Sequence, residues 1–131
     1  MARNALGAYQ KVQANTSTPI QRVLMVYNGI NKNLKLAIDA FDNANPDRFV
    51  VINNSIQLAE KLIGELQAAI DKTNGGELAV QLDDLYAFWI KHLAQANREK
   101  NRQMVIEVQQ MVADLTSGWV EVEKQLKNGT V

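Results

Sequence analysis

The chain has 131 residues, 47% of them hydrophobic, and this length and composition predict a single globular domain. Its 14 basic and 14 acidic residues cancel, which argues against a nucleic-acid-binding protein. Cysteine is absent, which excludes disulfides and thiolate chemistry, and no apolar run reaches the roughly 18 residues of a membrane span. Because the start also lacks the apolar core of a signal peptide, we predict a soluble, cytoplasmic protein without membrane insertion.

The first 17 residues are rich in Ala, Asn, Gln and Ser, with Leu6, Tyr9 and Val12 spaced three apart. So short and polar a segment does not hold a helix by itself, and we predict a mobile N-terminal arm over residues 1–17. The remaining residues, 18–131, are predicted to form one domain.

The first strong helix signal is the sequence STPIQ at residues 17–21. Thr18 is predicted as the N-cap, Pro19 as the first helical residue, and Gln21 completes a capping box. Apolar residues then recur with the helical period as far as Phe41. We therefore predict a first helix from residue 19 to about residue 41.

A second start signal follows, with Asn45 as the predicted cap and Pro46 as the first helical residue. The predicted seam of this helix alternates steps of three and four: Phe49, Ile52, Ile56, Ala59, Ile63, Leu66 and Ile70. A second apolar line runs beside it: Val51, Leu58, Leu62 and Ala69. The two glycines at residues 75–76 are predicted to end the helix, since glycine adopts the left-handed conformation readily.

The third predicted helix carries an apolar stripe from Leu78 to Ala96, and the polar segment NREKN at residues 97–101 is predicted to separate it from the fourth. The fourth stripe runs from Val105 through Trp119 to Leu126. Four amphipathic helices joined by short loops predict an all-α fold, an antiparallel up-down four-helix bundle.

His92, the single histidine, is the first candidate for chemistry, and we predict a solvated helix residue. A phosphotransfer histidine is the alternative, but neither lysine nor glycine follows it closely. A haem ligand paired with Met25, Met104 or Met111 is a further possibility that no other residue supports. The carboxylates match no metal-site spacing, so no cofactor, no metal and no enzyme are predicted.

Surplus apolar surface is the more informative feature, because Phe88, Ile90, Val51, Leu58 and Ile106 lie off the main stripes. Either a wide core absorbs these side chains, or they line a groove that receives an apolar helix from a partner. In the third helix we expect the adjacent aromatic residues to divide. Trp89 is predicted in the core, Tyr86 at its margin and Phe88 as a partner contact.

Two motifs carry a resemblance to a known family. The segment TSTPIQRVLMVYNG at residues 16–29 and the segment GGELAVQLDDLYAFWIKHLAQAN at residues 75–97 are similar to conserved blocks of the flagellin-specific export chaperones, the FliS family. AYQ at residues 8–10 and Trp119 also fall where that family has them. Arg22 departs from it by replacing an aliphatic residue, and His92 replaces a frequent arginine.

This resemblance implies a non-enzymatic cytoplasmic chaperone that binds the disordered C-terminal segment of flagellin. Binding prevents premature polymerisation, and the complex is delivered to the flagellar type III export gate. The partner-binding residues predicted on this basis are Tyr9, Ile20, Leu24, Tyr27, Leu58, Leu62, Leu82, Tyr86 and Phe88. Two alternatives stay open: a phosphotransfer module using His92, and a structural bundle that self-associates, including a weak homodimer.

Overall fold

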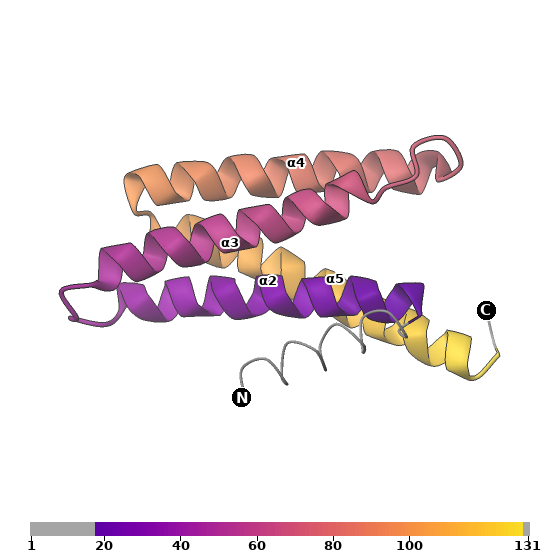
Figure 1. Cartoon of the computed structure of the whole chain (residues 1–131), viewed down its shortest axis with the longest axis horizontal. Helices are drawn as coiled ribbons and strands as arrows, with labels where there is room; N and C mark the ends of the chain where they lie inside the picture. Colours follow the sequence, from indigo (N-terminus) through magenta and orange to yellow (C-terminus); the bar gives the residue numbers. More distant parts are fainter. Residues whose placement is uncertain (1–17, 130–131) are drawn as a thin grey trace, which may run out of the picture.

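A computed structural model describes residues 18–129, which form four antiparallel helices connected by short loops (Figure 1). The helices are α2 (Pro19–Phe41), α3 (Arg48–Ala68), α4 (Gly76–Glu99) and α5 (Arg102–Lys127). The described residues contain no strand, so the predicted all-α bundle is confirmed. The predicted arm at residues 1–17, with Tyr9, lies outside the described residues.

The start of α2 follows the prediction. Thr18 Oγ1 accepts a hydrogen bond from the Gln21 backbone N–H at 3.3 Å, and Gln21 Oε1 accepts one from the Thr18 N–H at 3.1 Å. Pro19 occupies the first helical turn, where the missing N–H has no intrahelical acceptor. The capping box therefore places the start of α2 by local interactions alone.

The predicted start of α3 was wrong by two residues. Asn45 and Pro46 form a turn, in which Asn45 Oδ1 accepts from the Asp47 N–H at 2.9 Å and the Asn45 carbonyl accepts from the Arg48 N–H at 3.0 Å. Because the Asn45 side chain is used within this turn, it does not cap the helix. The helix begins at Arg48, after Asp47.

The loop between α3 and α4 also corrects the prediction. Helix α3 ends at Ala68, and Gly75 and Gly76 stand at the start of α4 instead of ending α3. A Cβ atom on Gly75 would lie 2.5 Å from the Asp71 carbonyl oxygen, so the loop requires glycine there. Gly76 has a positive φ of 61°, which glycine adopts at little cost.

The break between α4 and α5 is shorter than predicted. Helix α4 continues to Glu99, and only Lys100 and Asn101 separate the two helices. Lys100 adopts the left-handed conformation that ends α4, with a φ of 51°. Asn101 Oδ1 accepts from the Met104 N–H at 3.2 Å and so caps α5. The polar residues 97–99, which the sequence predicts in the break, form the last turn of α4 instead.

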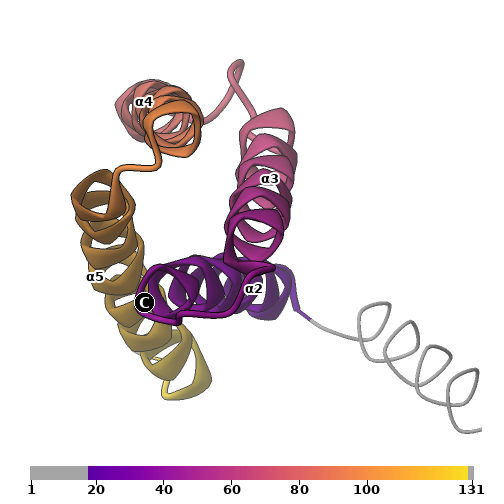
Figure 2. The same cartoon turned by 90° about the vertical axis from the view of Figure 1, so that its left-hand side faces the viewer.

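The helices form a ring in which α2 packs between α3 and α5, and α4 packs between the same two helices (Figure 2). Helix α5 begins beside the end of α4 and runs obliquely away from it toward the start of α2 (Figures 1 and 2). The largest fully buried side chains are Trp89, Tyr27, Ile30, Leu34, Ile52, Ile56, Ile63, Leu93, Val105, Val108 and Val112. All of these lie on the predicted stripes.

The apolar residues of the predicted stripes are no longer buried near some helix ends. Phe49 on α3, Leu78 on α4 and Leu126 on α5 are about half exposed, although each continues its helical period. Neighbouring helices do not fully cover these end turns. Apolar periodicity thus predicts which side of a helix faces inward, while the extent of burial depends on the neighbours.

Candidate partner-binding surface

Helix α3 presents an apolar line to solvent next to α2. Leu58 is 51% exposed and Val51 is also exposed, while Leu62, one turn after Leu58, packs partly against the core. Gly29 on α2 faces this line, since a Cβ there would lie 3.0 Å from Leu62 Cδ1. The absence of a side chain at Gly29 lets the two helices approach closely, so Leu62 is covered by backbone.

An apolar pocket of about 340 Å³ lies between α2 and the last turns of α3. It is lined by Pro19, Arg22, Val23, Val26, Glu65, Leu66 and Ala69. Its volume is in the range of sites that hold a few apolar side chains. The one basic and one acidic lining residue make this pocket electrostatically balanced.

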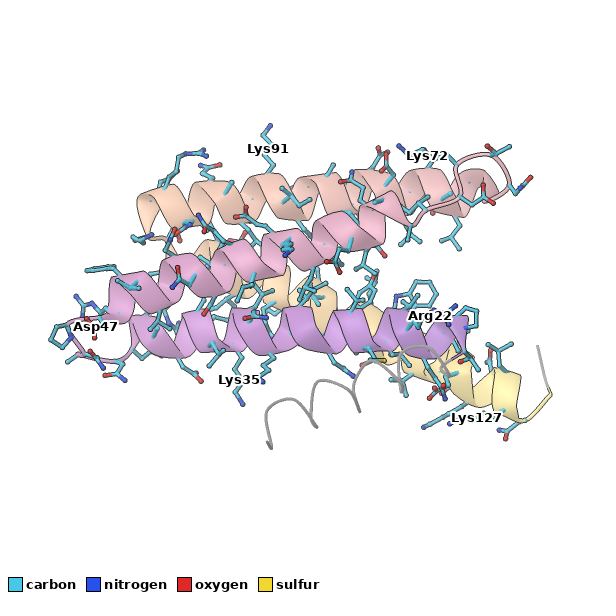
Figure 3. All side chains as sticks on the ribbon, viewed as in Figure 1. Arg22, Lys35, Asp47, Lys72, Lys91 and Lys127 are labelled. Atoms are coloured by element: carbon cyan, nitrogen blue, oxygen red, sulfur yellow. The ribbon has the colours of Figure 1, made fainter. Side chains whose placement is uncertain are left out.

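A second pocket, of about 490 Å³, lies between the start of α2 and the end of α5. Its lining residues are Thr18, Pro19, Ile20, Gln21, Val23, Glu123, Leu126 and Lys127. The Lys127 Nζ atom lies 3.7 Å from Glu123 Oε1, and Figure 3 shows Lys127 at this end of the bundle. Pro19 and Val23 line both pockets, so the first turns of α2 form a ridge between two apolar depressions.

The structure divides the predicted contact residues among different environments. Ile20 lines the α2–α5 pocket, Leu58 is exposed on α3, and Leu62 packs partly against the core. Phe88 is 44% exposed on α4, whereas Leu82 is partly buried against the core. These residues therefore do not form one continuous patch.

The other predicted contacts lie in the interior. Leu24, Tyr27 and Tyr86 are buried in the bundle of the free chain. The expected position of Tyr86 at the margin of the core was wrong, because Tyr86 packs against Tyr27 and Trp89 at centroid distances of 6.4 and 5.4 Å. These three side chains therefore belong to the core of the free chain and are not available to a partner at its surface.

The buried tyrosines form a polar contact inside an aromatic cluster. The Tyr27 and Tyr86 hydroxyl oxygens lie 2.6 Å apart, and the Tyr27 ring also contacts Trp119 at 6.2 Å. Burial raises the pKa of Tyr27 above its ordinary value, and burial together with the Tyr27 hydrogen bond raises the pKa of Tyr86. Both phenols are therefore neutral, which suits a structural role.

His92 is not the solvated residue that the sequence predicts. Its side chain is 18% exposed, and its Nε2 atom lies 2.9 Å from Glu107 Oε2 on α5. The imidazole also stacks on the Phe88 ring at 5.1 Å. The pattern of helix α4 alone does not reveal this arrangement, because Glu107 belongs to another helix. His92 connects α4 to α5, and its Nε2 faces Glu107.

Sequence reasoning missed Val26, Ala69 and Leu126 as members of possible contact sites. The sequence pattern places Ala69 in the second apolar line of its helix and Leu126 at the end of the last stripe, and it gives Val26 no role. Val26 directly precedes the buried Tyr27 on α2. An apolar residue one position from a buried one lies at the edge of the core, and this position is the sequence signal for Val26. Their shared pockets appear only when two helices are brought together.

Within residues 18–129, no helix has the length and apolarity to cross a bilayer. The same residues contain no group of three or more His, Asp or Glu side chains placed to hold a metal ion. Residues 18–129 thus form an all-helical bundle with exposed apolar side chains and two apolar pockets, the kind of surface that receives an amphipathic helix in known complexes.

The comparison with known proteins is more specific. Residues 2–126 match the family model described as "Flagellar protein FliS", and the chain therefore belongs to the FliS family. It is 30% identical to the flagellar secretion chaperone FliS of Bacillus subtilis (strain 168), over 98% of this chain and 95% of the relative.

Two further relatives agree. The flagellar secretion chaperone FliSB of Pseudomonas aeruginosa (strain PAO1) is 30% identical, over 90% of this chain and 94% of the relative. FliS of Vibrio cholerae serotype O1 is 27% identical, over 98% and 95%. Membership of this chaperone family confirms that the chain is not an enzyme, and nothing in the comparisons supports phosphotransfer through His92.

Proposed function

We propose that this protein is a cytoplasmic export chaperone for flagellin. It binds the disordered C-terminal segment of newly made flagellin, prevents premature polymerisation and helps deliver it to the flagellar type III export apparatus. Support comes from the relatives, which are named flagellar secretion chaperones over nearly the same length. The structural observation that carries the proposal is the pair of apolar pockets that share Pro19 and Val23.

The proposed binding mode is coupled folding on a preformed surface. A disordered segment that orders on binding loses about 2–5 kcal/mol. Fully burying a side chain such as Leu58 contributes about 1.5–3 kcal/mol. The two pockets and the α3 line therefore offer enough apolar surface to offset the ordering of a helical segment. In this proposal, Ile20 and Leu58 contact the partner directly, Leu62 supports Leu58 from the α2–α3 contact, and the buried Leu24 and Tyr27 hold α2 in place.

Phe88 and Leu82 on α4 extend the proposed contact region beyond the pockets. Phe88 is rigidly supported by its stacking on His92, which lowers the entropy lost when a partner covers the ring. Leu82 is partly buried and Tyr86 is buried, both on other sides of the same helix, so Phe88 is the α4 side chain of this set that remains open to a partner. A flagellin segment that reaches this side follows a path longer than either pocket.

The direct test is a titration of the purified full-length chain with a peptide of the flagellin C-terminal segment, followed by calorimetry. We expect saturable binding and a gain of helical circular dichroism. Absence of binding at millimolar concentrations, which corresponds to about −4 kcal/mol, contradicts the proposal. Light scattering of the free chain tests the self-associating alternative, because that alternative requires a dimer or larger species without any peptide.

We further propose that residues 1–17 cover the partner-binding surface when no flagellin is bound. Leu6, Tyr9 and Val12 supply apolar side chains immediately before the ridge at Pro19. If they cover the surface, deletion of residues 1–15 tightens peptide binding or promotes aggregation of the free chain. Weaker binding after deletion assigns Tyr9 to direct contact with the partner. Unchanged binding and solubility exclude a role of the arm as a lid.

A further inference from the structure

The facing sides of α4 and α5 carry an unusual charge pattern. On α4, one side of the helix holds Glu77, Gln81, Asp84, Phe88 and His92, in steps of three and four. On α5, one side holds Glu107, Met111, Asp114, Gly118 and Glu121, again in steps of three and four. The contact of 2.9 Å between His92 Nε2 and Glu107 Oε2 shows that these two sides meet at the end of α4 and the start of α5.

Because the helices are antiparallel, acidic residues of α4 and α5 stand at corresponding positions on either side of the widening gap. About two turns away from the His92–Glu107 contact, Asp84 on α4 corresponds to Asp114 on α5. About two turns further, Glu77 corresponds to Glu121. One attractive contact thus lies where the helices meet, and two acidic pairs lie where they separate.

The separation of the helices leaves apolar side chains incompletely covered. Leu78 on α4 is 58% exposed, and Leu85 is only partly buried. On α5, Leu115 and Val122 are partly buried, and a Cβ atom built on Gly118 meets no atom within 4 Å. Figures 1 and 2 show the end of α5 far from the start of α4.

No cation of residues 18–129 neutralises these carboxylates. Glu77 accepts a hydrogen bond from Gln81 at 3.4 Å, and none of the four acidic side chains forms an ion pair within that range. Lys72 pairs with Asp83, which lies on another side of α4. Lys91 points outward from α4, away from the bundle (Figure 3).

We propose that the facing sides of α4 and α5 bind an amphipathic helical segment that carries Lys or Arg beside its apolar stripe. Its apolar residues cover Leu78, Leu85 and Val122, and its cations lie between the two rows of carboxylates. The partner chemistry follows from charge complementarity, because the exposed carboxylates on both sides attract a basic segment and repel an acidic one. This surface is separate from the two pockets but shares Phe88 with the contact region proposed for flagellin, so the test below uses designed peptides instead of flagellin.

The test uses two designed amphipathic peptides with the same leucine stripe, one with lysine and one with glutamate on the polar side. The absence of cysteine allows Gly118→Cys to carry a single fluorescent label next to the proposed site, with Lys32→Cys on α2 as the control position. We expect the lysine peptide to bind at least about tenfold more tightly than the glutamate peptide at low salt. We also expect this preference to shrink as salt screens the charges.

Two variants with equal net charge identify the surface. The first combines Glu77→Gln, Asp84→Asn, Asp114→Asn and Glu121→Gln. The control combines Asp39→Asn, Asp47→Asn, Glu60→Gln and Glu99→Gln, which lie elsewhere. The first variant loses most of the preference for the lysine peptide, and the control retains it.

Three results overturn the proposal: equal binding of the two peptides, equal loss in both variants, or a label at residue 118 that responds no more than the label at residue 32. If a variant folds poorly, the salt dependence of peptide binding to the protein with all four carboxylates intact still tests the proposal.

Discussion

The hydroxyl oxygens of Tyr27 and Tyr86 lie 2.6 Å apart and connect α2 to α4 across the interior of the bundle. Trp89 contacts both tyrosines, and Trp119 contacts Tyr27, with ring centroids 6.3 and 6.2 Å from Tyr27. The aromatic cluster therefore joins α2, α4 and α5 where the surrounding helices begin to separate. One hydroxyl donates to the other, so each of these buried polar groups has a hydrogen-bond partner.

The first prediction concerns this hydroxyl pair. Tyr27→Phe leaves the Tyr86 hydroxyl buried without its partner, and we expect a loss of about 1–3 kcal/mol in the free energy of unfolding. Tyr27→Phe combined with Tyr86→Phe removes both polar groups, so its loss is smaller than the sum of the two single losses. Urea denaturation of the four proteins measures the coupling. Strict additivity contradicts a direct bond.

The second prediction concerns alkaline pH. Burial raises the folded-state pKa of both tyrosines above the value of 10.0 for the unfolded chain. Their contribution to stability is therefore fully present below about pH 10 and decreases as pH rises toward the folded-state pKa values. Each tyrosine contributes a decrease of up to about 1.4 kcal/mol per pH unit. The double phenylalanine variant lacks this component, so an identical pH dependence of the two proteins refutes the argument.

The third prediction compares two glycines. Gly75→Ala places a Cβ atom 2.5 Å from the Asp71 carbonyl oxygen, and we expect destabilisation of more than about 1 kcal/mol. Gly118→Ala adds a methyl group in open space within α5, and we expect stabilisation of about 0.5–1 kcal/mol. Thermal denaturation gives both signs. Equal effects of the two substitutions disagree with the described loop geometry.

The fourth prediction tests the α3 surface in the proposed function. Leu58→Ser removes an exposed apolar side chain, so we expect almost unchanged stability and roughly tenfold weaker binding of the flagellin peptide. Val80→Ser is the matched control, since Val80 is similarly exposed on the outer side of α4. Fluorescence anisotropy measures both affinities. Equal affinities of the two variants remove Leu58 from the proposed site.

Much of the fold was predictable because its signals are local or periodic. Thr18 and Gln21 interact within one helical turn, so the start of α2 is correct. The start of α3 was wrong because Asn45 has two local alternatives, a cap and a turn, and sequence does not rank them. The glycines at residues 75–76 were assigned to the wrong helix for a related reason, since both helix ends accept glycine.

The candidate sites were less predictable, because contacts between helices define them. The apolar pattern of its helix is compatible with Tyr86 either at the margin of the core or inside it. Tyr86 is buried because Tyr27, on another helix, packs against it. The pattern of its own helix predicts a solvated His92, but the side chain is partly buried and hydrogen-bonded because Glu107 of another helix lies opposite. The two pockets likewise depend on how α3 and α5 meet the first turns of α2.

The sequence by itself determined four amphipathic helices, their inward sides and the family, because these depend on periodicity and residue order. Only the tertiary structure decided which apolar side chains remain exposed, such as Leu58 and Phe88, and that α4 and α5 separate beyond His92 and Glu107. The physical reason is that burial and charge pairing depend on the distance between helices, and residues on one helix do not specify that distance.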